Sequence, residues 1–169
     1  ETINLDLTLS QFGFPLDGIV VKSSPIVADL NGDGMKEIYF GSDNEALHGY
    51  NSFGEEIDGF PFQSTDRVRS SAAVGDVDND GQMEIVFGNS SGKLYIVNHD
   101  GSRELAYTLL GFIEGAPALV DVDGDQDLEI VFTTTTTSGG QLYAIHHNGI
   151  TMSGFPKELG SMWTGPAVH

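Results

Sequence analysis

Short apolar segments alternate with turn residues along the chain. In its middle part, the segments 71–75, 84–88, 94–98 and 104–110 are rich in β-branched and aromatic residues, and Gly or Asx turns lie between them. Such spacing is typical of β-hairpins. No segment sustains the 3.6-residue apolar period of a helix. The pattern therefore predicts an all-β fold built from short antiparallel strands.

The pattern of segments repeats three times. The repeats read SSPIVADLNGDGMKEIYFGS from Ser23, SSAAVGDVDNDGQMEIVFGN from Ser70 and GAPALVDVDGDQDLEIVFTT from Gly115. Their leading aspartates, Asp29, Asp76 and Asp121, are 47 and 45 residues apart. The third repeat carries an insertion in the threonine-rich stretch 133–140, which predicts a longer hairpin there. A four-stranded unit of about 45 residues is typical of a β-propeller blade.

The repeat predicts a β-propeller fragment with three full four-stranded blades, at 16–61, 62–112 and 113–156. Segment 1–15 fits a closing strand, the last strand of a preceding blade, and segment 157–169 fits an opening strand at the start of the next one. A Gly-Phe-Pro sequence recurs at 13–15, 59–61 and 154–156, and we expect its phenylalanines, like Trp163, to pack between blades. Propellers typically close with four to eight blades. We therefore expect the remaining blades of a longer chain, or a second copy, to complete the ring.

Each repeat contains an acidic loop with oxygen-bearing side chains at alternate positions. Positions one, three, five, seven and nine are Asp29, Asn31, Asp33, Met35 and Glu37 in the first loop; Asp76, Asp78, Asp80, Gln82 and Glu84 in the second; and Asp121, Asp123, Asp125, Asp127 and Glu129 in the third. We expect side-chain oxygens at positions one, three, five and nine, with the backbone carbonyl of position seven, to surround one point. These fifteen residues are the candidate metal ligands.

Calcium is the cation that such a loop fits. It accepts 6–8 oxygen ligands at about 2.3–2.6 Å, and a ligand set without His or Cys argues against zinc or copper. Without a cation, carboxylates this close repel one another by about 1 kcal/mol or more per pair. An EF-hand would need a bidentate Glu at position twelve between helices, but Phe40, Phe87 and Phe132 stand there. An Asx-rich hairpin turn without metal is the alternative that remains open.

The third loop departs from the other two. Position six is Gly34 in the first loop and Gly81 in the second, where a sharp turn favours positive φ. In the third loop Gln126 stands there, and Asp127 adds an acid at position seven. We expect two calcium sites, and a third that either binds calcium with a strained turn or binds it weakly.

The overall charge excludes some partners. The chain has 25 acidic against 7 basic residues, a net charge of −18, and no cysteine. Such a surface repels nucleic acid and anionic membranes, and no apolar run approaches the roughly 20 residues of a membrane span. We therefore expect neither nucleic-acid binding nor membrane insertion.

The loops and their flanks resemble the FG-GAP/VCBS repeat family, which includes the integrin α-chain propellers and many bacterial secreted proteins. Residues 115–117 are similar to its GAP element, and residues 40–41 and 87–88 to its FG element. The resemblance implies an extracellular, secreted or cell-surface propeller with calcium in its hairpin loops. Glutamate at position nine, where integrin repeats favour aspartate, favours the bacterial-type group.

The resemblance also implies cell adhesion or ligand binding rather than catalysis. We expect a non-catalytic module with an unknown protein or glycan ligand and no catalytic residues. His99 and His147 fall at matching turns, which favours a structural role. Two alternatives remain open: part of a propeller-fold carbohydrate-active enzyme of the polysaccharide lyase type, and a lectin-like sugar-binding propeller.

Overall fold

The computed structural model describes residues 13–14, 16–160 and 166, and this part of the chain contains strands and turns but no helix. The strands are β1 (Ile26–Ala28), β2 (Glu37–Gly41), β3 (Ala46–Tyr50), β4 (Phe62–Gln63), β5 (Ala73–Gly75), β6 (Glu84–Gly88), β7 (Lys93–Asn98), β8 (Arg103–Thr108), β9 (Ala118–Val120), β10 (Glu129–Thr136), β11 (Gly139–Ile145) and β12 (Lys157–Leu159). They coincide closely with the apolar segments of the sequence.

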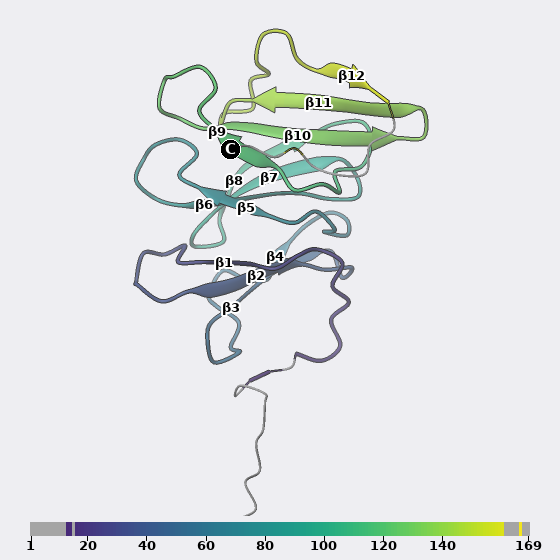
Figure 1. Ribbon diagram of the computed structural model, residues 1–169. Helices are drawn as coiled ribbons and strands as arrows, with labels where there is room; N and C mark the ends of the chain where they lie inside the picture. The colour runs from purple at the N-terminus through teal and green to yellow at the C-terminus, as the bar shows by residue number, and fades with distance from the viewer. Residues whose placement is uncertain (1–12, 15, 161–165, 167–169) are drawn as a thin grey trace, which may run out of the picture.

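The strands form three antiparallel four-stranded sheets, each in sequence order: β1 to β4, β5 to β8 and β9 to β12. Figure 1 shows the three sheets stacked one after another along the molecule, as blades of an open arc. The structure confirms the all-β class and the three four-stranded units of a propeller fragment. The threonine-rich insertion extends the β10–β11 hairpin, in which Thr133 pairs with Leu142 and Thr136 with Gly139.

Two apolar cores lie between the sheets. Tyr39 and Leu47 of the first sheet pack against Ile85, Phe87 and other residues of the second. Side chains of a strand alternate between its two faces, so Val86 points the other way, into a second core shared with the third sheet. All five residues of β6 are buried for this reason.

Two blade boundaries expected from the sequence, after residues 61 and 156, fall directly before the fourth strand of a sheet. β4 begins at Phe62 and pairs with β3, so it belongs to the first sheet rather than to the second blade as expected. β12 begins at Lys157 and pairs with β11, so it belongs to the third sheet. The Gly-Phe-Pro sequence therefore lies in the connection between the third and fourth strands and does not end the blade. The proposed closing strand at 1–15 and the rest of 157–169, Trp163 included, lie almost wholly outside the described residues.

The Gly-Phe-Pro turn of the first sheet contacts the neighbouring blade. Gly59 has a φ of 85°, and a Cβ atom at this position would lie 2.0 Å from the carbonyl oxygen of Asp100, in the β7–β8 turn of the second sheet. Gly101 approaches the carbonyl oxygen of Gly59 in the same way. The adjacent Phe60 is buried in the core between the first and second sheets, as expected for packing between blades.

Candidate metal centres

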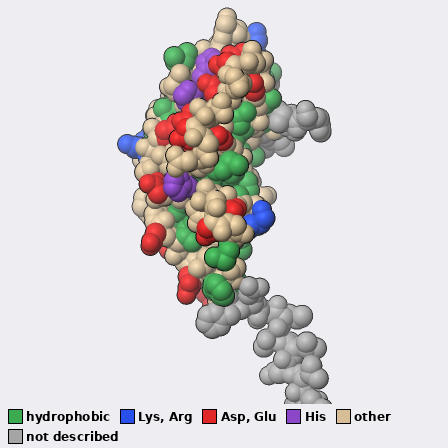
Figure 2. Space-filling view, turned by 90° about the vertical axis from the view of Figure 1, so that its left-hand side faces the viewer, with side chains coloured by type: hydrophobic (Ala, Val, Ile, Leu, Met, Phe, Trp, Pro, Cys, Tyr) green, Lys and Arg blue, Asp and Glu red, His purple; other side chains and the backbone are tan. Residues whose placement is uncertain are grey.

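The three acidic loops lie on one side of the molecule. They connect the first and second strands of each sheet, and in Figure 1 they project from the left-hand ends of the sheets. Figure 2 shows this side, where acidic side chains gather over the surface with histidines beside them. The repeated sequence pattern thus gives a repeated row of acidic loops in space.

Backbone hydrogen bonds curl each loop around its own carboxylates. The N–H of position six donates to the leading aspartate, from Gly34 to Asp29 and from Gly81 to Asp76, each at 2.9 Å. The N–H of position seven donates to the carboxylate of position five, at 2.7 Å in the first loop and 2.8 Å in the second. Because carboxylates accept these local bonds, the loop brings negative charge together around its centre.

The third loop makes the same two hydrogen bonds at greater length. Gln126 N–H donates to Asp121 at 3.3 Å, and Asp127 N–H donates to Asp125 at 3.2 Å. Positions four and six have positive φ in all three loops: Gly32, Asn79 and Gly124 at position four, and Gly34, Gly81 and Gln126 at position six. Gln126, with a φ of 85°, therefore adopts the strained turn that the sequence predicted.

The glutamate at position nine is the buried member of each loop. Glu37, Glu84 and Glu129 are 4%, 3% and 0% exposed, and each begins the second strand of its sheet. In each loop its Oε2 accepts the N–H of position two, at 3.3, 2.8 and 2.7 Å in turn. A buried carboxylate needs compensating partners. This bond occupies only one of its two oxygens.

The structure brings predicted ligands of the second and third loops together in clusters, and none of the clusters found among the described residues lies in the first loop. Oxygens of Asp76, Asp78 and Glu84 lie within 4.8 Å of one another, and so do oxygens of Asp121, Asp123 and Asp125. In the first loop, Asn31 Oδ1 accepts the N–H of Asp33 at 3.0 Å and closes the equivalent turn. These oxygen-rich clusters could hold a metal ion, and carboxylate oxygens are donors that calcium accepts.

Two buried oxygens among the predicted ligands lack a hydrogen-bond partner. They are Oδ1 of Asp29 in the first loop and Oδ1 of Asp127 in the third. A buried polar atom without a partner is costly, and a cation bound in the loop would offset that cost. This observation supports the fit of the loops to a metal ion.

The position-seven residues place their side chains differently. Met35 is 58% exposed, consistent with a position that contributes only its backbone carbonyl. Gln82 Nε2 donates to Asp80 at 3.0 Å, and Asp127 Oδ2 lies 3.4 Å from His147 Nε2. Position seven is thus where the three loops differ most in chemistry.

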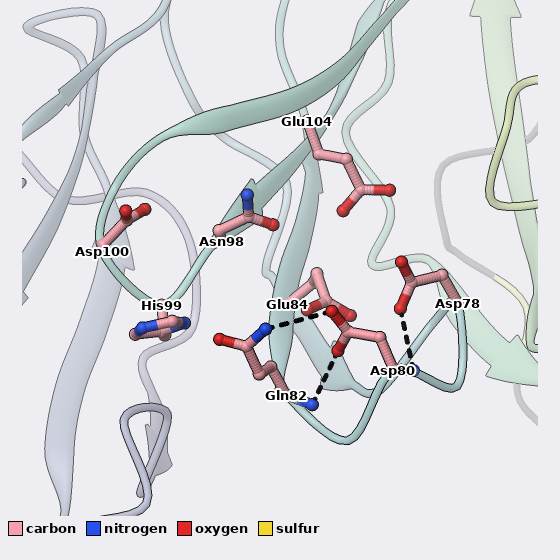
Figure 3. Close-up of a pocket in the computed structure, with 8 residues that line it drawn as sticks. All are labelled: Asp78, Asp80, Gln82, Glu84, Asn98, His99, Asp100 and Glu104. Carbon is pink, nitrogen blue, oxygen red and sulfur yellow. Dashed lines mark hydrogen bonds between the residues drawn. The ribbon is translucent and has the colours of Figure 1, made fainter.

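A hollow of about 380 Å³ lies beside the second loop, lined by Asp78, Asp80, Gln82, Glu84, Asn98, His99, Asp100 and Glu104. Figure 3 shows the acidic side chains of the loop on one side of the hollow and Glu104, from β8, across from them. The two dashed bonds from Gln82 to Asp80 hold the rim of the loop. The hollow is polar and acidic, which suits a hydrated cation.

Burial and mutual repulsion disturb these carboxyls. Burial raises the pKa of Glu84 to about 7. The hydrogen bond from the Val77 N–H opposes this rise, and the nearby charges of Asp78 and Asp80 add to it. Burial also raises the pKa of Glu104, with Asp78 adding to it. In the third loop, burial and then Asp125 raise the pKa of Asp123. Raised carboxyl pKa values are typical of carboxylates that are buried and lie close to one another.

Two histidines beside the third loop are functional candidates that the sequence analysis missed. His146 Nδ1 lies 3.0 Å from Glu129 Oε1, and His147 contacts Asp127 as described above. The sequence contains a sign of this difference, because His146 occupies the position in its repeat that Asn51 and Asn98 occupy in theirs, at the end of the third strand. Only the pairing of β10 with β11 shows that this position faces the glutamate.

Three four-stranded antiparallel units with an acidic loop in each first hairpin define a repeat protein of the β-propeller class. The FG-GAP-like repeat family matches residues 29–87 and 76–132, which together span more than half of the chain. The chain belongs to this family. None of the curated proteins matches the chain.

Two solved structures are similar in part. The biofilm matrix protein Bap1 of V. cholerae is 19% identical with a TM-score of 0.45, over 76% of this chain and 27% of that one. BBS1N, in complex with ARL6DN, is 12% identical with a TM-score of 0.39, over 85% of this chain and 55% of that one. The chain thus spans about a quarter of the length of the Bap1 chain and about half of the length of the BBS1N chain. No described segment forms a helix that is both long and apolar enough to cross a membrane.

Proposed function

We propose that this chain is a calcium-stabilised, extracellular binding or adhesion module without catalytic activity. The observation that carries the proposal is the same loop built three times, with a buried glutamate at position nine of each and clustered acidic oxygens in the second and third loops. Membership of the FG-GAP-like repeat family supports the extracellular, adhesive part of the proposal.

Calcium acts here as a structural ion. It neutralises the carboxylates of each loop, and it ties the hairpin that begins each blade to the buried start of the second strand. An ion that binds only the folded chain adds RT ln(1 + [Ca]/Kd), which is about 2.7 kcal/mol per site at a hundred times Kd. For a domain of this size that corresponds to a rise in melting temperature of roughly 5–10 °C per site.

Thermal unfolding of the full chain tests the calcium assignment. We expect the melting temperature to rise with calcium and to fall again when a chelator is added. Asp80→Ala should remove the contribution of the second loop and leave that of the first. The same melting curve in calcium and in chelator would contradict the assignment.

Three histidines are held in place by carboxylates, as in a structural role. His48 pairs with Glu56, His146 with Glu129 and His147 with Asp127. His48 lies on β3 and Glu56 in the turn after it, away from the acidic loops. These contacts orient loops and hairpins.

Binding and turnover assays test the second half of the proposal. The chain, loaded with calcium, is tested against a glycan array and against polysaccharide-coated surfaces, with chelator-treated chain as control. We expect calcium-dependent retention and no change in polymer length. Depolymerisation of an acidic polysaccharide by the purified chain would instead establish the enzymatic alternative.

A further inference from the structure

A second hollow, of about 270 Å³, lies at the end of the sheets opposite the acidic loops. In an antiparallel sheet, the turn from the second to the third strand lies opposite the turn from the first to the second, and in Figure 1 these turns are on the right. The walls of the hollow are the linker between the first and second sheets, the β6–β7 turn and the linker between the second and third sheets. The lining residues are Asp66, Arg67, Arg69, Ser90, Phe112 and Glu114.

Backbone hydrogen bonds hold these walls in place. The Ser90 N–H donates to the carbonyl oxygen of Arg67 at 2.9 Å, which ties the β6–β7 turn to the first linker. Phe112 and Thr135 exchange two backbone hydrogen bonds, of 2.8 and 2.9 Å, which tie the second linker to β10. The hollow is therefore largely preorganised, and a preorganised site lowers the cost of ordering groups when a ligand binds.

An aromatic ring is exposed at this wall. Phe112 is 47% exposed, although its backbone is fixed to β10, whereas Phe87 and Phe132 of the neighbouring strands are 0% exposed. An apolar ring beside a few polar groups is typical of ligand sites. Its flat face can pack against the C–H groups of a ligand.

The polar part of the lining offers both donors and acceptors. The side chain of Arg67 is 51% exposed, and its Nε lies 3.6 Å from Asp66 Oδ1, which is longer than a hydrogen bond. Guanidinium groups only donate and carboxylates only accept, so Asp66 and Glu114 complement Arg67. The Oγ atom of Ser90 is buried and has no hydrogen-bond partner among the described residues.

The charges of the hollow favour a neutral ligand. The carboxylates of Asp66 and Glu114 balance the two arginines of the lining, and Arg69 also donates to both carboxylate oxygens of Asp43, at 2.7 and 3.1 Å. The net charge of −18 further repels anionic polymers. A hydroxyl group both donates and accepts. A neutral ligand rich in hydroxyl groups can therefore pair with the arginine and the carboxylates alike.

We propose that this hollow binds one residue of a neutral sugar, with Phe112 against the apolar face of the sugar ring and with Arg67 and Glu114 on its hydroxyl groups. The volume of about 270 Å³ is just below the roughly 300–1,000 Å³ of sites for drug-sized ligands, and it suits a single small ring. The inference deepens the proposed function. It rests on that function only for the view that the chain is a binding module, and it does not involve the calcium loops.

Saturation-transfer NMR on the full chain in saturating calcium tests the inference. The probes are the methyl glycosides of glucose, galactose, mannose and N-acetylglucosamine, with methyl glucuronide as the anionic comparison. We expect at least one neutral glycoside to bind, with a Kd in the millimolar range because the ligand is small. Methyl glucuronide should bind at least tenfold more weakly, because its carboxylate meets those of the lining.

Matched variants locate the bound sugar. Phe112→Ala should weaken binding at least tenfold, and Arg67→Ala, which changes a half-exposed side chain, provides a second test if Phe112→Ala does not fold. Leu110→Ala removes an 83% exposed apolar side chain from the same linker but outside the hollow, and Arg103→Ala removes an exposed arginine of β8. Both controls should bind as the parent chain does. Circular dichroism checks that each variant keeps the strand signal.

Three results would overturn the inference: no binding of any neutral glycoside, equally strong binding of methyl glucuronide, or unchanged binding in folded Phe112→Ala or Arg67→Ala. The proposed function fails separately. If no glycoside binds while calcium raises the melting temperature, the inference falls and the calcium assignment stands. If a glycoside binds and Arg67→Ala loses it, while the melting temperature is the same in calcium and in chelator, the inference holds and the calcium assignment does not.

Discussion

The second and third repeats have nearly the same strands and loops but different surroundings. The second sheet has a neighbour on each face, and Val77, at position two of its loop, is 0% exposed. The equivalent Val122 of the third loop is 54% exposed, because no described residue covers that face of the third sheet. Both loops nevertheless share the N–H bonds of positions two, six and seven to the carboxylates of positions nine, one and five. The shape of the loop is therefore set locally, and its burial is set by the next blade.

The contacts of the Gly-Phe-Pro turns show the same difference. Gly59 lies against the β7–β8 turn of the second sheet, whereas the nearest atom to a Cβ on Gly154 would be the flexible amine of Lys157, at 3.7 Å. The two glycines have similar φ angles, 85° and 88°. The first blade uses this glycine for close backbone contact with the second, and the third blade has the same turn with no other described blade against it.

Alanine at these two glycines should give the largest difference between the repeats. Gly59→Ala adds strain at positive φ, about 1–2 kcal/mol, and it forces the backbone of Asp100 away, at a further cost of about 1–3 kcal/mol. Gly154→Ala should cost only the first amount. Urea denaturation in saturating calcium measures both. Equal losses would mean that the contact between Gly59 and Asp100 does not contribute to stability.

Removing the buried glutamate should have the next largest effect. Glu84→Ala leaves the buried N–H of Val77 without its acceptor, which costs about 1–3 kcal/mol even in chelator. Asp80→Ala is the matched control, since Asp80 is a predicted ligand on an exposed part of the loop, and it should lose stability mainly in calcium. Denaturation of both variants with and without calcium separates the two roles. A Glu84→Ala chain as stable as Asp80→Ala in chelator would contradict a structural role for the glutamate.

The sequence predicted the strands and loops well because both depend on local residues. Alternating apolar segments located the strands, and the spacing of the aspartates located the loops. The fourth strands of the first and third sheets were assigned to the wrong side of a boundary, since Gly-Phe-Pro resembles the end of a unit. β4 and β12 are short, and only their pairing with β3 and β11 shows where they belong.

The parts of the site that the sequence did not predict depend on contacts between strands. His146 reaches Glu129 from seventeen positions away in sequence, so the contact requires knowledge of the β10–β11 register. The exposure of Val122 depends on a neighbouring sheet, and no property of the valine itself indicates it. Gln126 is the opposite case, because the glycines at the same position of the other loops predicted its positive φ.

Exchanging the residues at position six should have a smaller, reciprocal effect. Gly81→Gln should lower the stability of the chain by about 1 kcal/mol, because a side chain is strained at positive φ. No atom lies within 4 Å of the new Cβ, so the loss reports the backbone alone. Gln126→Gly should stabilise the third loop by a similar amount. If both changes lower stability equally, side-chain contacts of Gln126 outweigh the strain in its turn.

The stability of the second loop should also depend on pH. Burial raises the pKa of Glu84 from 4.5 to about 7, so its folded state favours the protonated form. The stability that this adds in chelator is fully present below about pH 4.5 and is lost as the pH rises through 7. Glu84→Gln carries no such proton, so the melting temperature of the parent chain, relative to this variant, should fall between pH 5 and pH 8.

Calcium should cancel this dependence, because the ion needs the ionised carboxylate and displaces the proton from it. In saturating calcium, the difference in melting temperature between the parent chain and Glu84→Gln should therefore change little between pH 5 and pH 8. Melting temperatures of both chains over this range, in chelator and in calcium, give the two slopes. The same slope in calcium as in chelator would mean that Glu84 does not ligate the ion, and that only its hydrogen bond from Val77 keeps it at the base of the loop.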